Sequence, residues 1–187
     1  MNIRLIFFTV LLMVLMLPVQ ALQLRDPESH FFDETFGDLQ EELATAKEQG
    51  KKAILIMFEM EECPFCKRMK AKVLNRDDIQ EYFREHFLIL TMDVEGDLEI
   101  TDFQGNATTQ KEFALKQYRV RATPVFQFVD LDGRPIKKAR YTGATSDANE
   151  FKLLGQYVVD ERYKETSFVR YKRQMKQEKK QEMKEQK

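Results

Sequence analysis

The sequence predicts an α/β fold, with a mixed central sheet of about four strands flanked by helices on both faces. Helical and strand patterns alternate along most of the chain, which then closes with a hairpin signal and an amphipathic helix. The length of 187 residues suits one compact domain with additional segments at its ends. Hydrophobic residues make up 43% and charged residues 33%, which excludes a multi-span membrane protein and a wholly disordered chain.

The first half of the domain shows two helix–strand units. Apolar residues at helical spacing predict a helix over 38–49, and the continuous apolar run over 52–58 is typical of a strand buried on both faces. A second helix begins at Cys63 and runs to about Leu74. Pro64 suits the first turn of this helix, because its missing N–H is not needed there.

The pattern continues with a further helical segment over 77–83 and a second apolar strand over 87–94. The segment 95–108 is polar, acidic and irregular, and we expect a solvated loop near the active-site face. It fits no EF-hand spacing. Thr109 and Glu112 form a capping box, which predicts a short helix after this loop.

The last part of the domain contains a third strand over 125–129 and a hairpin signal at Asp132-Gly133. The returning strand is expected over 136–141. Asp147 and Glu150 then cap a final amphipathic helix, whose apolar residues lie on one side.

The only two cysteines of the chain lie in the tetrapeptide Cys63-Pro64-Phe65-Cys66. Two cysteines cannot form the dense disulfide framework of a small secreted scaffold. With only two scattered histidines, they also make a poor zinc site. We therefore expect neither a metal ion nor a cofactor.

Two cysteines separated by two residues at a helix start can form a redox-active disulfide. The thiol of Cys63 lies at the helix N-terminus, where free N–H groups and the helix dipole favour its thiolate. Cys66 lies about one turn further on and is expected to be more shielded, so Cys63 attacks and Cys66 resolves. The alternatives are a structural disulfide, which would constrain so short a loop little, and half of a metal site.

The order of elements, the Cys63-Pro64-Phe65-Cys66 motif and Ala122-Thr123-Pro124 before a strand together resemble the thioredoxin superfamily over about residues 36–165. The resemblance implies a thioredoxin fold. The residues around the motif, 58–69, are most similar to exported bacterial thioredoxins of the SoxW-like group, and the segments 101–103, 118–124 and 155–160 support the same group.

The resemblance implies that Pro124 is a cis-proline beside the cysteines. A cis bond at an X-Pro position costs little, and it would expose the backbone of Thr123 to an extended substrate segment. The alternative is an ordinary trans proline at the start of a strand.

The sequence departs from ordinary thioredoxins at several positions. Met57 replaces the buried aspartate of the strand, Glu62 replaces the tryptophan before the first cysteine, and Pro64-Phe65 replaces Gly-Pro. Glu59 lies on the same strand face as Met57 if the strand continues, so it could shuttle a proton to Cys66. The alternative is a strand-end carboxylate satisfied by local backbone.

Both ends of the chain differ in composition from the domain over 22–169. Arg4, the apolar run 5–17 and Val19-Gln20-Ala21 have the layout of a secretory signal peptide over 1–21, with an uncleaved membrane anchor as the alternative. Either way we expect export, and a periplasmic location. The segment 170–187 is a charged tail, either a frayed helix extension or disordered, with eight basic and three acidic residues. It could touch anionic lipid or an acidic partner, or simply be solvated.

The formal net charge of −1 gives no reason to expect nucleic-acid binding. The favoured function is an exported thiol–disulfide oxidoreductase that reduces disulfides of client proteins. The resemblance implies a membrane-bound thiol electron donor, and we expect a monomer. An isomerase or oxidant with the same motif, and a non-catalytic binding module, are the alternatives.

Overall fold

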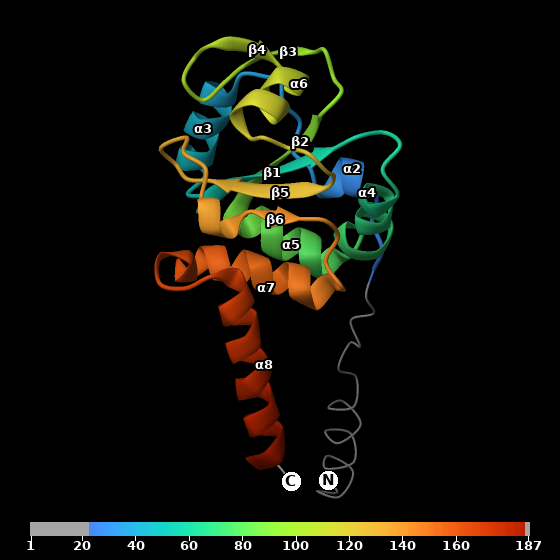
Figure 1. The fold of residues 1–187 in the computed structure, drawn as a ribbon, viewed down its shortest axis with the longest axis vertical. Helices are drawn as coiled ribbons and strands as arrows, with labels where there is room; N and C mark the ends of the chain where they lie inside the picture. Colours follow the sequence, from blue (N-terminus) through green and yellow to red (C-terminus); the bar gives the residue numbers. More distant parts are fainter. Residues whose placement is uncertain (1–22, 186–187) are drawn as a thin grey trace, which may run out of the picture.

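The computed structural model describes residues 23–185, so the predicted signal peptide lies outside the described residues. The centre is a four-stranded sheet in the order β2-β1-β5-β6 (Figure 1). Its strands are β1 (Ala53–Glu59), β2 (Phe87–Asp93), β5 (Val125–Val129) and β6 (Tyr141–Thr142). β1 pairs in parallel with β2 and antiparallel with β5, which confirms the predicted mixed sheet.

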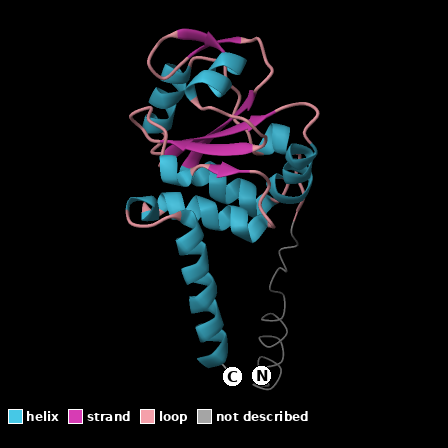
Figure 2. Cartoon of the chain, in the orientation of Figure 1, coloured by secondary structure: helices cyan, strands magenta, loops and turns pink. Residues whose placement is uncertain are grey.

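Helices cover both faces of this sheet (Figure 2). α5 (Asp77–His86) and α7 (Ala148–Val159) lie on one face, whereas α3 (Leu39–Glu48) and α6 (Gln110–Glu112) lie on the other. The remaining helical elements are α2 (Pro27–His30), α4 (Pro64–Met69), α8 (Phe168–Glu185), the π-helical turns Lys70–Leu74 and Phe113–Gln117, and the 3-10 turns Lys137–Ala139 and Arg162–Lys164.

The central strand β1 divides the hydrophobic core into two clusters. Successive side chains of a strand point to opposite faces, so Leu55 and Met57 join the cluster under α5 and α7, whereas Ile54 and Ile56 join the cluster under α3. All four side chains are fully buried. The continuous apolar run is thus explained by a strand with no solvent-facing side.

The segment 95–108 is more ordered than the solvated loop we expected. β3 (Glu99–Thr101) and β4 (Ala107–Thr109) pair antiparallel in it. The carboxylate of Asp102 is buried and accepts hydrogen bonds from the amides of Gln104 and Asn106, both at 2.9 Å. Three-residue strands are too short to show a periodic pattern, which is why the sequence indicated an irregular loop.

The prediction of a returning strand over 136–141 was wrong for most of its length. The hairpin turn is present, with the amide of Asp130 donating to the carbonyl of Arg134 at 2.8 Å. The returning chain then forms the 3-10 turn Lys137–Ala139 before β6 begins. This turn places the small side chain of Ala139 in the core, so its burial does not come from a strand face.

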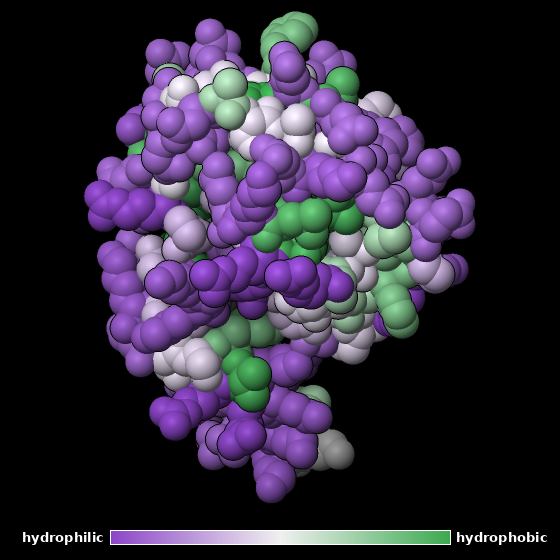
Figure 3. Space-filling view, turned by 45° about the horizontal axis from the view of Figure 1, so that its top comes forward, coloured by the Kyte–Doolittle hydropathy of each residue, from purple (hydrophilic) through white to green (hydrophobic). Residues whose placement is uncertain are grey.

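The predicted tail 170–187 is helical as far as the structure describes it. α8 begins at Phe168, and both Phe168 and Tyr171 pack against Tyr157 of α7 with ring centroids 5.5 and 5.4 Å apart. The rest of α8 projects away from the domain (Figure 1), and hydrophilic residues dominate the surface at that end (Figure 3). Between residues 23 and 185, no helix is both long and apolar enough to cross a membrane.

Candidate active site

Cys63 and Cys66 form a disulfide at the start of α4, with their Cα atoms 5.2 Å apart. Cys63 is the N-cap residue of this helix, and its Sγ accepts a hydrogen bond from the amide of Cys66 at 3.0 Å. An amide N–H at a helix N-terminus stabilises negative charge on an N-cap atom. The geometry therefore favours a thiolate on Cys63 once the disulfide is reduced.

The exposure of the two sulfur-bearing residues differs less than the sequence suggested. Cys63 is 4% exposed and Cys66 is 1% exposed. The asymmetry of the pair thus rests on the N-cap position of Cys63 rather than on shielding of Cys66. Phe65, between them, is 56% exposed and gives the motif an apolar surface.

Three charged neighbours of the motif have partners in the structure. Glu62 forms an exposed ion pair with Lys67 at 3.8 Å, so these two residues oppose each other's effect on Cys63. The guanidinium of Arg68 donates to the carbonyls of Thr145 and Ser146, both at 3.1 Å. Arg68 therefore ties α4 to the loop before α7.

The predicted proline has the expected conformation. The peptide bond between Thr123 and Pro124 is cis. Val125 pairs with Phe58, so Pro124 lies at the end of β1 from which the chain runs on to Cys63. The carbonyl of Pro124 is occupied by the amide of Gly143, whereas the backbone of Thr123 makes no hydrogen bond to any residue in 23–185. This free backbone is what strand-like pairing with a substrate requires.

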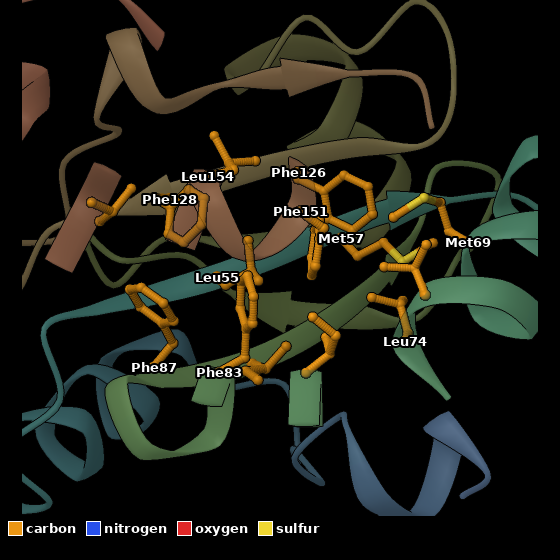
Figure 4. Packing of buried hydrophobic residues seen from close by; sticks show 14 of the residues in the cluster. Leu55, Met57, Met69, Leu74, Phe83, Phe87, Phe126, Phe128, Phe151 and Leu154 are labelled. Atoms are coloured by element: carbon orange, nitrogen blue, oxygen red, sulfur yellow. The ribbon is translucent and has the colours of Figure 1, made fainter. Parts of the chain in front are cut away.

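Met57 and Glu59 occupy the same face of β1, as predicted, but their surroundings differ. Met57 is fully buried among apolar side chains that include Met69, Phe126 and Phe151 (Figure 4). Glu59 is the last residue of β1, and its side chain is 16% exposed. The chain thus places a carboxylate at the edge of the core and not within it.

The carboxylate of Glu59 belongs to a polar cluster that sequence reasoning missed. Its Oε1 accepts hydrogen bonds from Nζ of Lys70 at 2.7 Å and from Oγ1 of Thr91 at 2.8 Å. Oε2 has no hydrogen-bond partner among the residues that the structure describes. Nζ of Lys70 also contacts Oε1 of Glu28 at 2.6 Å, which links α2 to the site.

Lys70 holds this cluster together. Burial alone would lower the pKa of Lys70, but hydrogen bonds to Glu28 and Glu59 outweigh that effect and raise the pKa above its ordinary value. Lys70 therefore stays charged and balances its carboxylate neighbours. The only signal in the sequence was a lysine one turn after Cys66, and the contact with Glu28 arises from tertiary packing.

Glu59 and Cys66 line a common hollow of about 310 Å³, which also includes Lys70 and Asp93. Asp93 ends β2 and pairs with Glu59 across the two parallel strands. The structure thus brings the predicted carboxylate and the second cysteine to one small hollow. Solvent in such a hollow can carry a proton between two groups.

A family model described as a thioredoxin-like domain matches residues 39–159. A search of curated proteins found no match. A thioredoxin-fold protein from Helicobacter pylori is 21% identical, with a TM-score of 0.53 over 67% of this chain and 87% of that one. A thioredoxin from Thermus thermophilus is 24% identical, with a TM-score of 0.51 over 70% of this chain and 88% of that one.

The mixed sheet with its flanking helices and the disulfide at the start of α4 define a thioredoxin-fold protein with a CxxC redox pair. The matched residues cover more than half of the chain and include both cysteines and Pro124. The chain belongs to the thioredoxin-like domain family. The site is consistent with thiol–disulfide oxidoreductase activity.

Proposed function

We propose that this protein is an exported thiol–disulfide oxidoreductase that reduces disulfides of client proteins. The observation that carries the proposal is the hydrogen bond from the amide of Cys66 to Sγ of Cys63 at the N-terminus of α4. It stabilises a thiolate on one cysteine of the pair, which is the requirement for attack on a disulfide.

The reaction consists of two exchanges. The Cys63 thiolate attacks one sulfur of the client disulfide, that S–S bond breaks, and the client's other sulfur leaves as a thiolate. Cys66 then loses its proton and attacks Sγ of Cys63, which releases the second client thiolate and closes the Cys63–Cys66 disulfide. The client gains two electrons and two protons, and the protein is left oxidised.

The free backbone of Thr123 would hold the client during the first exchange by pairing with an extended segment next to its cysteine. In the second exchange Glu59 would accept the proton of Cys66 through the shared hollow, as general base. Their common position at one end of β1 and β5 supports both assignments.

Substitution of single cysteines tests the assigned roles. Cys66→Ser should accumulate clients as mixed disulfides on Cys63, because the second exchange cannot occur. Cys63→Ser should accumulate none. Non-reducing gels of both variants, with the double variant as control, show which cysteine forms mixed disulfides with clients. Equal trapping by both single variants would contradict the assigned roles.

The direction of electron flow is tested by the redox potential of the Cys63–Cys66 pair and by insulin reduction with dithiothreitol. A reducing potential and faster insulin precipitation than with Cys63→Ser would support a reductant, regenerated by a membrane-bound thiol donor. An oxidising potential would favour an oxidant or isomerase. No difference between wild type and Cys63→Ser would indicate a binding module.

The proposed periplasmic location is supported by the signal-like segment 1–21 and by the similarity around the motif to exported SoxW-like thioredoxins. N-terminal sequencing of protein from the periplasmic fraction should give Leu22 as the first residue. Recovery of residues 1–21 in a membrane fraction would favour a retained anchor.

A further inference from the structure

α8 separates its charges onto opposite sides. Its 18 residues include seven basic and three acidic side chains. Four of the basic residues follow one another at spacings of three or four and form one line along the helix, which we call the basic stripe: Arg173, Lys176, Lys180 and Lys184.

The acidic residues of α8 lie on another side. Glu178, Glu182 and Glu185 are also spaced by four and three, but at about 100° per residue Glu178 lies ~160° around the helix from Lys180. Because the two signs do not alternate, the charges do not serve mainly as pairs along the helix. The separation leaves one side of α8 with basic side chains and no acidic ones.

Two residues of the basic stripe, Arg173 and Lys176, line the groove between α7 and α8, but no residue of the stripe is buried. All four of its residues are exposed, and none forms an ion pair with any residue in 23–185. The helix is held to the domain by Phe168 and Tyr171, together with a contact from Lys172 to Glu150 at 2.6 Å. Beyond Met175, α8 contributes no further buried residue to the domain.

Two exposed apolar side chains accompany the stripe. Val169 lies one turn before Arg173 and is 62% exposed, whereas Met183 lies beside Lys180 and is 53% exposed. Because these two apolar residues lie near opposite ends of α8, they form no continuous apolar face, and the charge of the stripe is its main surface feature.

We propose that the basic stripe of α8 binds the surface of a membrane rich in anionic phospholipid and holds the domain next to the bilayer. Three of its four residues are lysines. A lysine carries a compact charge that suits attraction to a diffuse negative surface, whereas arginine is favoured where a side chain pairs bidentately with one carboxylate or phosphate. The domain over 22–169 carries a net charge of −7, so an anionic membrane repels it. A projecting helix lets the stripe reach the surface while the acidic domain remains further away.

This inference is independent of the thiol chemistry, and vesicle co-sedimentation tests it. The chain beginning at Leu22 is suitable, because it contains both core clusters and lacks the apolar run 5–17, which would bind lipid by itself. We expect sedimentation at low salt with vesicles of equal parts phosphatidylglycerol and phosphatidylethanolamine, but not with phosphatidylcholine. Raising the salt concentration should release the protein.

The test variant carries Arg173→Gln, Lys176→Gln, Lys180→Gln and Lys184→Gln. Its control removes four positive charges from exposed, unpaired lysines of the domain: Lys47→Gln, Lys111→Gln, Lys137→Gln and Lys138→Gln. The first should weaken binding to the anionic vesicles roughly 10- to 100-fold, and the second should change it little.

Thermal melts and insulin reduction should be the same for both variants, which shows that each is folded. Equal weakening by the two variants would mean that total charge and not the stripe attracts the membrane, and would overturn the proposal. Failure of the unaltered chain to bind anionic vesicles would also overturn it. An acidic protein would then be the remaining kind of partner for the stripe.

Discussion

At the scale of single residues, the site depends on how one strand ends. Glu59 is the last residue of β1, where the side chain reaches the edge of the core and meets Lys70 and Thr91. Two residues earlier, Met57 has no exposed surface and lies within the apolar cluster under α5 and α7. A carboxylate at position 57 would be destabilised by the loss of its hydration. At Glu59, the positive charge of Lys70 compensates for the carboxylate.

Glu59→Gln should slow the second exchange, because an amide cannot accept the proton of Cys66. We expect client release from a preformed mixed disulfide on Cys63 to be about 10- to 100-fold slower. The rate of release should also depend less on pH below neutrality. Stopped-flow measurement with a cysteine peptide gives this rate.

The matched control is Glu61→Gln, which changes an exposed carboxylate at the rim of the same hollow. Lys70→Met is the second variant, since it should leave the Glu59 carboxylate present but no longer held at 2.7 Å. A rate and pH profile unchanged in Glu59→Gln would remove Glu59 from the mechanism.

At the scale of elements, the beginning of α7 is a junction between three segments. The carboxylate of Asp147 caps the helix by accepting the amide of Glu150 at 2.9 Å. Glu150 accepts hydrogen bonds from Ser146 at 2.6 Å and from Lys172 of α8 at 2.6 Å. One carboxylate thus fixes the loop before α7 and the first turns of α8.

The stability of this junction should depend on pH. Burial would raise the pKa of Glu150, but the hydrogen bonds from Lys172 and Ser146 outweigh it and lower the pKa from 4.5 to about 2. The folded state therefore binds this proton less readily than the unfolded state. The stabilisation is complete above the unfolded pKa and is lost as the pH falls towards 2.

Glu150→Gln should lower the free energy of unfolding at pH 7 by about 1–3 kcal/mol, allowing for the partial exposure of Lys172. The difference from wild type should shrink between pH 5 and pH 2. Urea unfolding across this range measures it, with the exposed Glu182→Gln as control. A constant difference at all pH values would show that the lost stability is not electrostatic.

The attachment of α8 depends on its first turn. Phe168 is 8% exposed, and its ring packs against Tyr157 and Tyr141. Phe168→Ala should lower the free energy of unfolding by about 3 kcal/mol through lost burial and an unfilled space. Val169→Ala, at an exposed neighbour, should change it by less than about 0.5 kcal/mol. Comparable losses in the two variants would mean that α8 is not docked as described.

At the scale of the whole molecule, the stability against local opening should decrease from the sheet towards the end of α8. β1 has hydrogen-bonded neighbours on both sides and a core cluster on each face, whereas α8 beyond Met175 has no buried residue. Amide hydrogen exchange should therefore be slowest in β1 and fast over 176–185, because local opening there exposes little apolar surface. Equally slow exchange in both segments would contradict this description.

Much of the fold could be predicted from the sequence because its main elements carry local signals. The runs over 52–58 and 87–94 are continuous apolar segments, and the caps at Thr109 and Asp147 are formed by neighbouring residues. The Cys63–Cys66 pair is likewise local, since three residues of helix place the two sulfur atoms together.

Other features depend on contacts between distant segments, and only the tertiary structure decided them. The pairing of β3 with β4 and the 3-10 turn before β6 are stabilised by burial that no short pattern records. The contact of Lys70 with Glu28 joins residues far apart in the chain. Local propensity and motif spacing are properties of the sequence itself, whereas the partners of a buried charge are set by packing of the whole chain.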